Sequence, residues 1–179
     1  MGSTPAARTT FQSSDVAIET KRKGYMSDPQ RPRKDHYNPP PEKTYEIPDE
    51  LLGGHMKEVL LLEDDQGLTE LLSESLEGFS CSVTVATNGV EGLRKVMAQD
   101  YDVILCDMVM PNLSGDMFYL AVERVRPHLC KRFIFMTGHA EDQNWGAFAR
   151  QKGCLILYKP FKFEVLLESI QMVTARTSA

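Results

Sequence analysis

In the stretch Asp102-Val-Ile-Leu-Cys-Asp107, the apolar residues run unbroken and stop at a carboxylate. A short run without alternation is typical of a strand that is buried on both faces of a sheet. Similar strand-like runs occupy residues 59–62, 82–86, 132–136 and 154–158. Segments with apolar residues at helical spacing lie between and after these runs, at residues 66–78, 89–99, 115–125, 141–151 and 163–174.

This alternation predicts five βα units in one α/β domain. Strands buried on both faces are typical of parallel sheets with helices on either side, and right-handed crossovers then give a doubly wound, five-stranded (βα)5 sandwich. In such a sheet, ligands bind outside the carboxyl ends of the strands, where the strand order reverses. The residues that follow each strand are therefore the first candidates for function.

The composition of the chain changes near residue 55. Residues 1–55 hold seven of the ten prolines and no sustained apolar periodicity, so we expect a disordered or extended tail there. The tail carries eight basic and eight acidic residues, and the net charge of −5 therefore belongs to the remainder. We predict one folded domain at residues 56–179.

Three features of the tail bear on what it binds and on whether it is native to the chain. The basic stretch from Lys21 to Lys34 is either a solvated charge run or a docking peptide for an acidic surface. Residues 45–52 are the one part of the tail with enough apolar character to bind a partner. Gly53-Gly-His-Met56 resembles a cloning junction, so the tail is either native or a fused segment.

The bulk composition argues against several classes of function. The mild negative charge is not that of a general nucleic-acid binder, and no apolar run reaches the length of a membrane span. The N-terminus lacks the apolar region of a secretory signal, and the four cysteines form no CxxC pair. We expect a cytoplasmic protein with reduced thiols.

Chemically active side chains follow four of the five predicted strands. They are Glu63-Asp-Asp65 after the first, Asp107 after the third, Thr137 after the fourth and Lys159-Pro160 after the fifth. Carboxylates that converge in one crevice repel each other unless a cation neutralises them, and Mg²⁺ prefers such oxygen ligands. A lysine and a hydroxyl in the same crevice suit the oxygens of a transferred phosphoryl group. The set predicts phosphoryl transfer to a carboxylate nucleophile.

Four stretches of the chain resemble the receiver domain of bacterial response regulators and hybrid histidine kinases. They are Val59-Leu-Leu-Leu-Glu-Asp-Asp65, residues 102–116 with Met-Pro-Asn-Leu-Ser-Gly115, Phe135-Met-Thr-Gly-His-Ala140 and Tyr158-Lys-Pro-Phe161. The resemblance covers residues 56–179 and implies a flavodoxin-like sheet with strand order 2-1-3-4-5. It also implies a phosphoacceptor of a two-component phosphorelay, which takes its phosphoryl group from a phosphohistidine on a histidine kinase or histidine phosphotransfer domain.

The resemblance assigns a role to each residue of the phosphoacceptor site. It implies that Asp107 is the phosphoacceptor, that Thr137 is the hydroxyl that moves onto the phosphate, and that Lys159 is the cation paired with it. A cis peptide bond before Pro160 is expected to aim the lysine inward, since cis bonds are essentially confined to proline.

The resemblance also implies a set of Mg²⁺ ligands. Asp64 is the expected direct ligand, with Glu63 acting through water. The carboxylate of Asp107 and the backbone carbonyl of Val109 complete the set. Asp65 lies one position beyond the acidic pair, and its charge is expected to help without ligating.

Two features depart from the family pattern. The aromatic switch position, three residues before Lys159, is Ile156, and we expect the nearby Tyr158 to point to the opposite face of the strand. The two positions that tune the lifetime of the phosphate are Val109 and His139. Neither is a carboxylate or amide that would orient an attacking water, so we expect self-dephosphorylation to be slow, over minutes to hours.

We expect a signalling phosphoacceptor, not an enzyme, that acts through a changed partner-binding surface. The sequence does not identify the output protein, and dimerisation on phosphorylation is a further expectation. The domain is expected to be either a stand-alone receiver or part of a larger protein. Two alternatives stay open. One is a receiver-like interaction scaffold that works without phosphorylation, and the other is a haloacid-dehalogenase-like phosphatase, whose second aspartate would fall at Val109.

Overall fold

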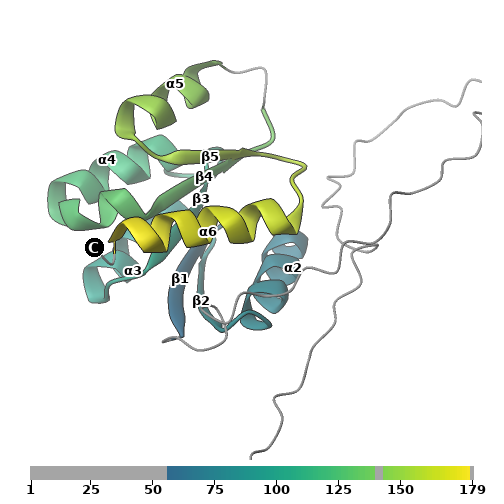
Figure 1. Ribbon diagram of the computed structural model, residues 1–179. Helices are drawn as coiled ribbons and strands as arrows, with labels where there is room; N and C mark the ends of the chain where they lie inside the picture. Colours follow the sequence, from purple (N-terminus) through teal and green to yellow (C-terminus); the bar gives the residue numbers. More distant parts are fainter. Residues whose placement is uncertain (1–55, 140–142, 178–179) are drawn as a thin grey trace, which may run out of the picture.

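Five apolar runs form a parallel sheet in the computed structural model, which describes residues 56–139 and 143–177 (Figure 1). The strands are β1 (Lys57–Leu62), β2 (Cys81–Ala86), β3 (Val103–Asp107), β4 (Phe133–Thr137) and β5 (Leu155–Tyr158). Their order is β2-β1-β3-β4-β5, and every neighbouring pair is parallel. The predicted doubly wound (βα)5 fold and its strand order are confirmed.

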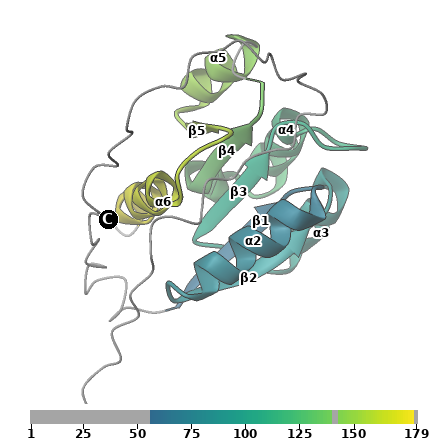
Figure 2. The ribbon, with the colours of Figure 1, turned by 90° about the vertical axis from the view of Figure 1, so that its right-hand side faces the viewer.

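Helices cover both faces of the sheet (Figure 2). They are α2 (Gln66–Glu77), α3 (Gly89–Ala98), α4 (Gly115–Val125), the 3₁₀ helix η1 (Pro127–Arg132), α5 (Gln143–Lys152) and α6 (Phe163–Thr177). Apolar residues of α2 and α6 pack with one face of the sheet, and those of α3, α4 and α5 pack with the other. Within the described residues, no helix is long and apolar enough to cross a membrane.

Each central strand supplies both cores, because successive side chains of a strand point to opposite faces. In β1, Val59 and Leu61 belong to the core under α2 and α6, whereas Leu60 and Leu62 belong to the core under α3, α4 and α5. All four side chains are fully buried. The unbroken apolar run is therefore the sequence signature of a strand between two helical layers.

The largest differences from the predicted boundaries are at the start of β1, which begins at Lys57 instead of residue 59, and at the end of α6, which reaches Thr177 instead of residue 174. β3 and β4 each extend one residue further than predicted, because Asp107 pairs with Met136 and Thr137 pairs with Tyr158 in the ladder. The sequence pattern did not predict η1, which begins at Pro127. The predictions for residues 1–55 lie outside the described residues, as does the start of the helix predicted from residue 141.

Candidate functional site

The carboxyl ends of four strands bring the predicted side chains together. Asp107 ends β3 and Thr137 ends β4, while Glu63 directly follows β1 and Lys159 directly follows β5. Because Leu62 is the register partner of Cys106, the next residues, Glu63 and Asp107, emerge side by side. Glu63, Asp107 and Thr137 are buried residues, and the side chain of Lys159 is only 5% exposed. These four side chains therefore have little access to water, whereas Asp64 beside them is exposed.

Lys159 bridges the two buried carboxylates. Its Nζ atom lies 2.6 Å from Oε2 of Glu63 and 2.7 Å from Oδ2 of Asp107. Charged hydrogen bonds of this length are the strong kind, and neither carboxylate would be stable in so buried a place without a cation. Lys159 thus holds the phosphoacceptor candidate in a fixed position.

The pKa values of this group reflect burial and mutual charge. Burial raises the pKa of Glu63 to about 7; the lysine charge opposes this shift, and the charge of Asp107 adds to it. Burial by itself would lower the pKa of Lys159, but the charges of Asp107 and Glu63 outweigh burial, so its pKa is raised. The crevice carries more negative charge than its single lysine neutralises.

Three carboxylates are placed to hold a divalent cation. Glu63, Asp64 and Asp107 each offer an oxygen, and these oxygens lie within 4.8 Å of one another. Such a donor set fits a hard cation that prefers oxygen ligands. The carboxylate of Asp65 is engaged elsewhere, since its Oδ1 accepts the backbone N–H of Leu68 at 2.8 Å and caps α2. The pair that faces the crevice is therefore Glu63 and Asp64.

Val109 and Thr137 contact the crevice through their backbone or hydroxyl groups. The Val109 N–H donates to Oδ1 of Asp107 at 3.2 Å, while its side chain is 46% exposed beside the site. The Thr137 hydroxyl oxygen accepts the backbone N–H of His139 at 3.1 Å. This bond ties the start of the loop after β4 to a buried side chain, so a movement of the hydroxyl would release the loop.

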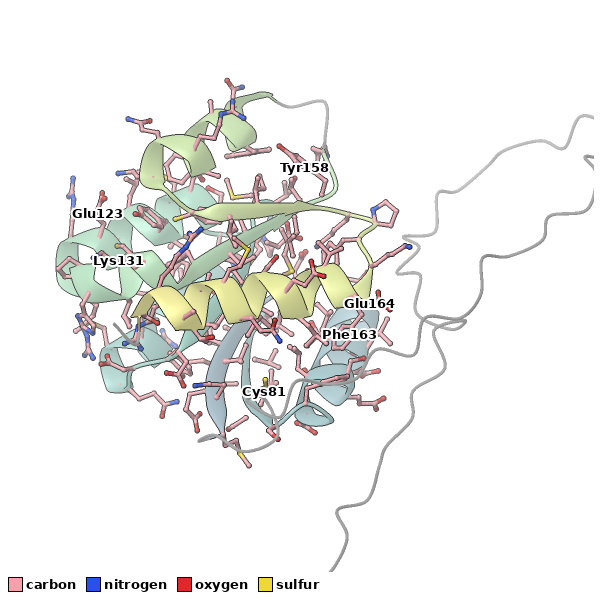
Figure 3. The ribbon with its side chains drawn as sticks, in the orientation of Figure 1. Cys81, Glu123, Lys131, Tyr158, Phe163 and Glu164 are labelled. Carbon is pink, nitrogen blue, oxygen red and sulfur yellow. The ribbon has the colours of Figure 1, made fainter. Side chains whose placement is uncertain are left out.

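The residues around Lys159 agree with prediction at one position and differ at another. The Lys159–Pro160 peptide bond is cis, as predicted. The prediction that Tyr158 points to the opposite face from Ile156 is wrong. Ile156 packs against the core under α3, α4 and α5, and a Cβ atom on Gly146 of α5 would lie 2.9 Å from the Tyr158 hydroxyl. Residues two apart on a strand share a face, and Figure 3 labels Tyr158 between β5 and α5.

Gly115 is a residue of the site to which the sequence pattern gave no role. A Cβ atom there would lie 2.5 Å from the backbone oxygen of Asp107, so a larger residue would displace the strand end. Its N–H donates to the Met108 oxygen at 3.1 Å. The turn from Pro111 to Gly115 was the available signal, because glycine in such a turn often marks a close approach of two backbones.

The raised pKa of Glu63 gives a prediction for stability without divalent cations. Between the ordinary pKa of 4.5 and the folded value of about 7, the folded state binds a proton that the unfolded state has lost. The free energy of unfolding should therefore fall as pH rises through this window. Urea titrations in EDTA at several pH values measure it. The Glu63→Gln variant should show a flatter profile, and an unchanged profile would contradict the assignment.

Comparisons of the sequence with known proteins identify one family. Residues 59–171 match the family described as "Response regulator receiver domain". Transcription factor SKN7 of Candida albicans is 38% identical over 104 residues, which are 58% of this chain and 18% of that protein. The CpxR homolog of Haemophilus influenzae, a transcriptional regulatory protein, is 32% identical over 124 residues, 69% of this chain and 53% of that protein. The chain thus spans only part of the length of these relatives.

Solved structures resemble the described fold over nearly their whole length. A response regulator receiver domain protein from Clostridium thermocellum has 27% identity and a TM-score of 0.62, covering 68% of this chain and 97% of that chain. The receiver domain of the sensor histidine kinase PA1611 from Pseudomonas aeruginosa, with a magnesium ion in its active site cleft, has 26% identity and a TM-score of 0.60. That match covers 66% of this chain and 98% of the other.

Proposed function

Because the chain belongs to the response regulator receiver domain family, it is a phosphoacceptor receiver of two-component signalling, and we propose that Asp107 accepts the phosphoryl group. The observation that carries this choice is the bridge from Lys159 to Asp107 and Glu63 at the carboxyl edge of the sheet. Among the buried carboxylates of the crevice, Asp107 ends the central strand and is held from both sides, by Lys159 and by the Val109 N–H.

The proposed reaction is an in-line displacement at phosphorus. An oxygen of Asp107 forms the new P–O bond while the P–N bond of the donor phosphohistidine breaks, and the imidazole nitrogen keeps the electron pair. Lys159, already hydrogen-bonded to Asp107, would pair with the negative charge of the incoming phosphoryl group. Positioning and charge neutralisation by these residues then account for most of the catalysis.

We propose that the cation of this site is Mg²⁺, held by Asp64, by Glu63 through water, by Asp107 and by the backbone carbonyl of Val109. When bound, Mg²⁺ would neutralise the carboxylates and the phosphoryl oxygens. The donor set of carboxylates that share one crevice supports this choice.

Thr137 is the proposed link from the phosphate to the surface. Its hydroxyl now accepts the N–H of His139, and donation to the phosphate would withdraw it from the loop. Thr137 is also the register partner of Tyr158, whose side chain is 40% exposed beside α5. We therefore place the changed partner-binding surface on β4, β5 and α5, as a population shift between two arrangements.

Incubation of the full chain with acetyl phosphate and Mg²⁺ tests the proposed function. Intact-mass measurement should show a gain of one phosphate that is lost in hydroxylamine, as an acyl phosphate would be. An unchanged mass would favour the receiver-like scaffold that works without phosphorylation. Continuous release of phosphate from an aryl phosphate would instead favour a haloacid-dehalogenase-like phosphatase.

The lifetime of the phosphate gives a second prediction. Val109 and His139 flank the site but cannot position an attacking water as an amide or carboxylate would, so phosphate loss should take minutes to hours. The Val109→Asn variant should shorten the lifetime by about tenfold or more, as expected for a group that positions water. The decay of the phosphorylated mass measures it. Val90→Asn is the matched control, since Val90 is 43% exposed on α3. A wild-type lifetime of a few seconds would contradict the prediction.

The remaining parts of the proposal concern partners and organisation. The proposed donor is a histidine kinase or histidine phosphotransfer domain, with no direct contact to nucleic acid. We place this exchange in the cytoplasm, where the four free cysteines would stay reduced. The proposed domain division is a tail at residues 1–55 and a receiver at residues 56–179, with dimerisation on phosphorylation as one form of output.

A further inference from the structure

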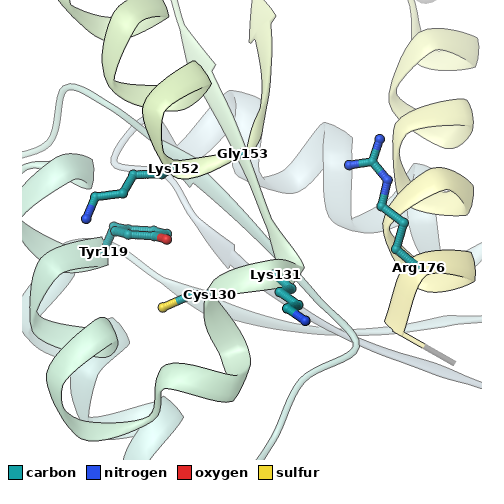
Figure 4. A pocket seen from close by; sticks show the side chains of 6 residues that line it. All are labelled: Tyr119, Cys130, Lys131, Lys152, Gly153 and Arg176. Atoms are coloured by element: carbon teal, nitrogen blue, oxygen red, sulfur yellow. The ribbon is translucent and has the colours of Figure 1, made fainter. Parts of the chain in front are cut away.

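A cavity of about 340 Å³ opens at the end of the sheet opposite Asp107 (Figure 4). It lies where β4 and β5 begin, among η1, the ends of α5 and α6, and the middle of α4. Its lining residues are Tyr119, Cys130, Lys131, Lys152, Gly153 and Arg176. Three of these six residues are cationic and none is acidic, so the cavity favours an anionic ligand.

Two of the three cationic side chains, those of Lys131 and Arg176, are available to pair with an anionic ligand. Lys152 is engaged, because its Nζ atom lies 2.8 Å from Glu123 and 5.3 Å from the centroid of the Tyr119 ring. Lys131 and Arg176 form no ion pair within residues 56–139 and 143–177. Both are exposed residues.

The cations surround the cavity instead of converging on one point. In Figure 4, Lys152 lies over Tyr119 on one side, Arg176 stands on the opposite side, and Lys131 lies between them. A compact anion would reach one of these charges at a time. A peptide with several carboxylates along its length would reach both Lys131 and Arg176, which stand at the surface around the buried Tyr119.

The start of β1 lies at the same end of the molecule as the cavity. Leu60 is the register partner of Ile104, which is the partner of Phe133, so Met56 lies at the level of η1 or beyond it. Only β3 separates β1 from β4, and at the spacing of neighbouring strands this distance is about 10 Å. An extended chain of six or seven residues spans about 20 Å. The residues that precede Met56 are thus long enough to reach the cavity.

The segment at that position has the required composition. Residues 45–52 read Tyr-Glu-Ile-Pro-Asp-Glu-Leu-Leu, with three acidic residues among four apolar or aromatic ones. The basic stretch from Lys21 to Lys34 has the wrong charge for this cavity. We propose that the cavity is a docking site for residues 45–52 of the same chain, whose carboxylates pair with Lys131 and Arg176. This docking is independent of phosphoryl transfer at Asp107.

Hydrogen exchange of the full chain tests the docking from the side of the segment. In a triple variant with Glu46→Gln, Asp49→Asn and Glu50→Gln, amide exchange should rise several-fold at residues 128–132 and 152–154. A matched variant with Asp15→Asn, Glu19→Gln and Asp28→Asn also removes three tail carboxylates and should leave exchange unchanged. Both variants leave residues 56–179 unchanged. A folding defect of a mutated domain therefore does not affect the comparison. Equal exchange in both variants would overturn the proposal.

The cavity side is tested with the Lys131→Glu/Arg176→Glu variant. Amide protection at residues 45–52 should be lost, whereas Arg94→Glu/Arg124→Glu should retain it. These control arginines are exposed and form no ion pair in the described part of the chain. High salt should weaken the protection of residues 45–52 in the wild-type chain, because the proposed ion pairs lie near the surface. Protection that rises with protein concentration would point to a second copy as the occupant and contradict docking within one chain.

Discussion

The Asp107→Asn variant should gain no phosphate from acetyl phosphate and Mg²⁺, while the Asp65→Asn variant should gain one. An amide oxygen is a poor nucleophile and a weak ligand for a hard cation, so the change at Asp107 removes both proposed functions of this side chain. The expected loss is complete within the sensitivity of intact-mass measurement. Asn at residue 65 keeps the cap of α2, because Asn and Asp are equivalent at this position of a helix.

These two variants also distinguish two assignments of the acidic pair that holds the cation, Glu63 with Asp64 or Asp64 with Asp65. Both substitutions replace a carboxylate by an amide at the same edge of the sheet, and only one of them lies in the cluster of Glu63, Asp64 and Asp107. Thermal melts of the two variants should confirm that both fold. If the Asp107→Asn variant gained a hydroxylamine-sensitive phosphate, another carboxylate would be the acceptor. If Asp65→Asn abolished the gain, the pair would have to be Asp64 and Asp65.

The Lys159→Met variant should lose both stability and phosphate uptake. Methionine fills most of the volume of lysine but leaves Glu63 and Asp107 buried without their cation. Removing one partner from a buried ion pair costs about 3–5 kcal/mol, and the loss should be largest above pH 7, where Glu63 is ionised. At lower pH, protonation of Glu63 should relieve part of it.

Urea unfolding in EDTA at pH 6 and pH 8 measures this effect. Lys162→Met is the matched control, because Lys162 is exposed three residues along the chain and should change stability by no more than about 0.5 kcal/mol. Mg²⁺ should restore part of the stability of Lys159→Met, since the cation would neutralise the same carboxylates. Equal losses in the two variants would show that the bridge does not stabilise the fold.

The fold could be predicted from the sequence because burial dictates the pattern of each strand. The runs at Val59–Leu62 and Val103–Cys106 are apolar at every position, which a strand needs only when both faces are covered. The exact ends of β3 and β4 could not be predicted, because the register that extends them to Asp107 and Thr137 depends on neighbouring strands. A polar residue at a strand end gives no local signal of pairing.

The candidate site was predictable for a similar reason, since each of its side chains lies at or directly after the carboxyl end of a buried strand. The orientation of Tyr158 was predicted wrongly, although alternation along β5 would have placed it with Ile156 on the side of α5. The basic cavity could not be predicted. Its residues are spread from Tyr119 to Arg176 along the chain and converge only through the packing of four elements.

The position of the site on the sheet edge affects how this chain can diverge. The spacing of Glu63, Asp107, Thr137 and Lys159 depends on the strands, which are buried between two cores. The outer faces of the helices contribute nothing to that spacing, and substitutions on exposed surfaces usually change stability by about 0.5 kcal/mol or less. Descendant sequences can therefore replace the side chains that select a partner, while the phosphoacceptor chemistry is inherited without change.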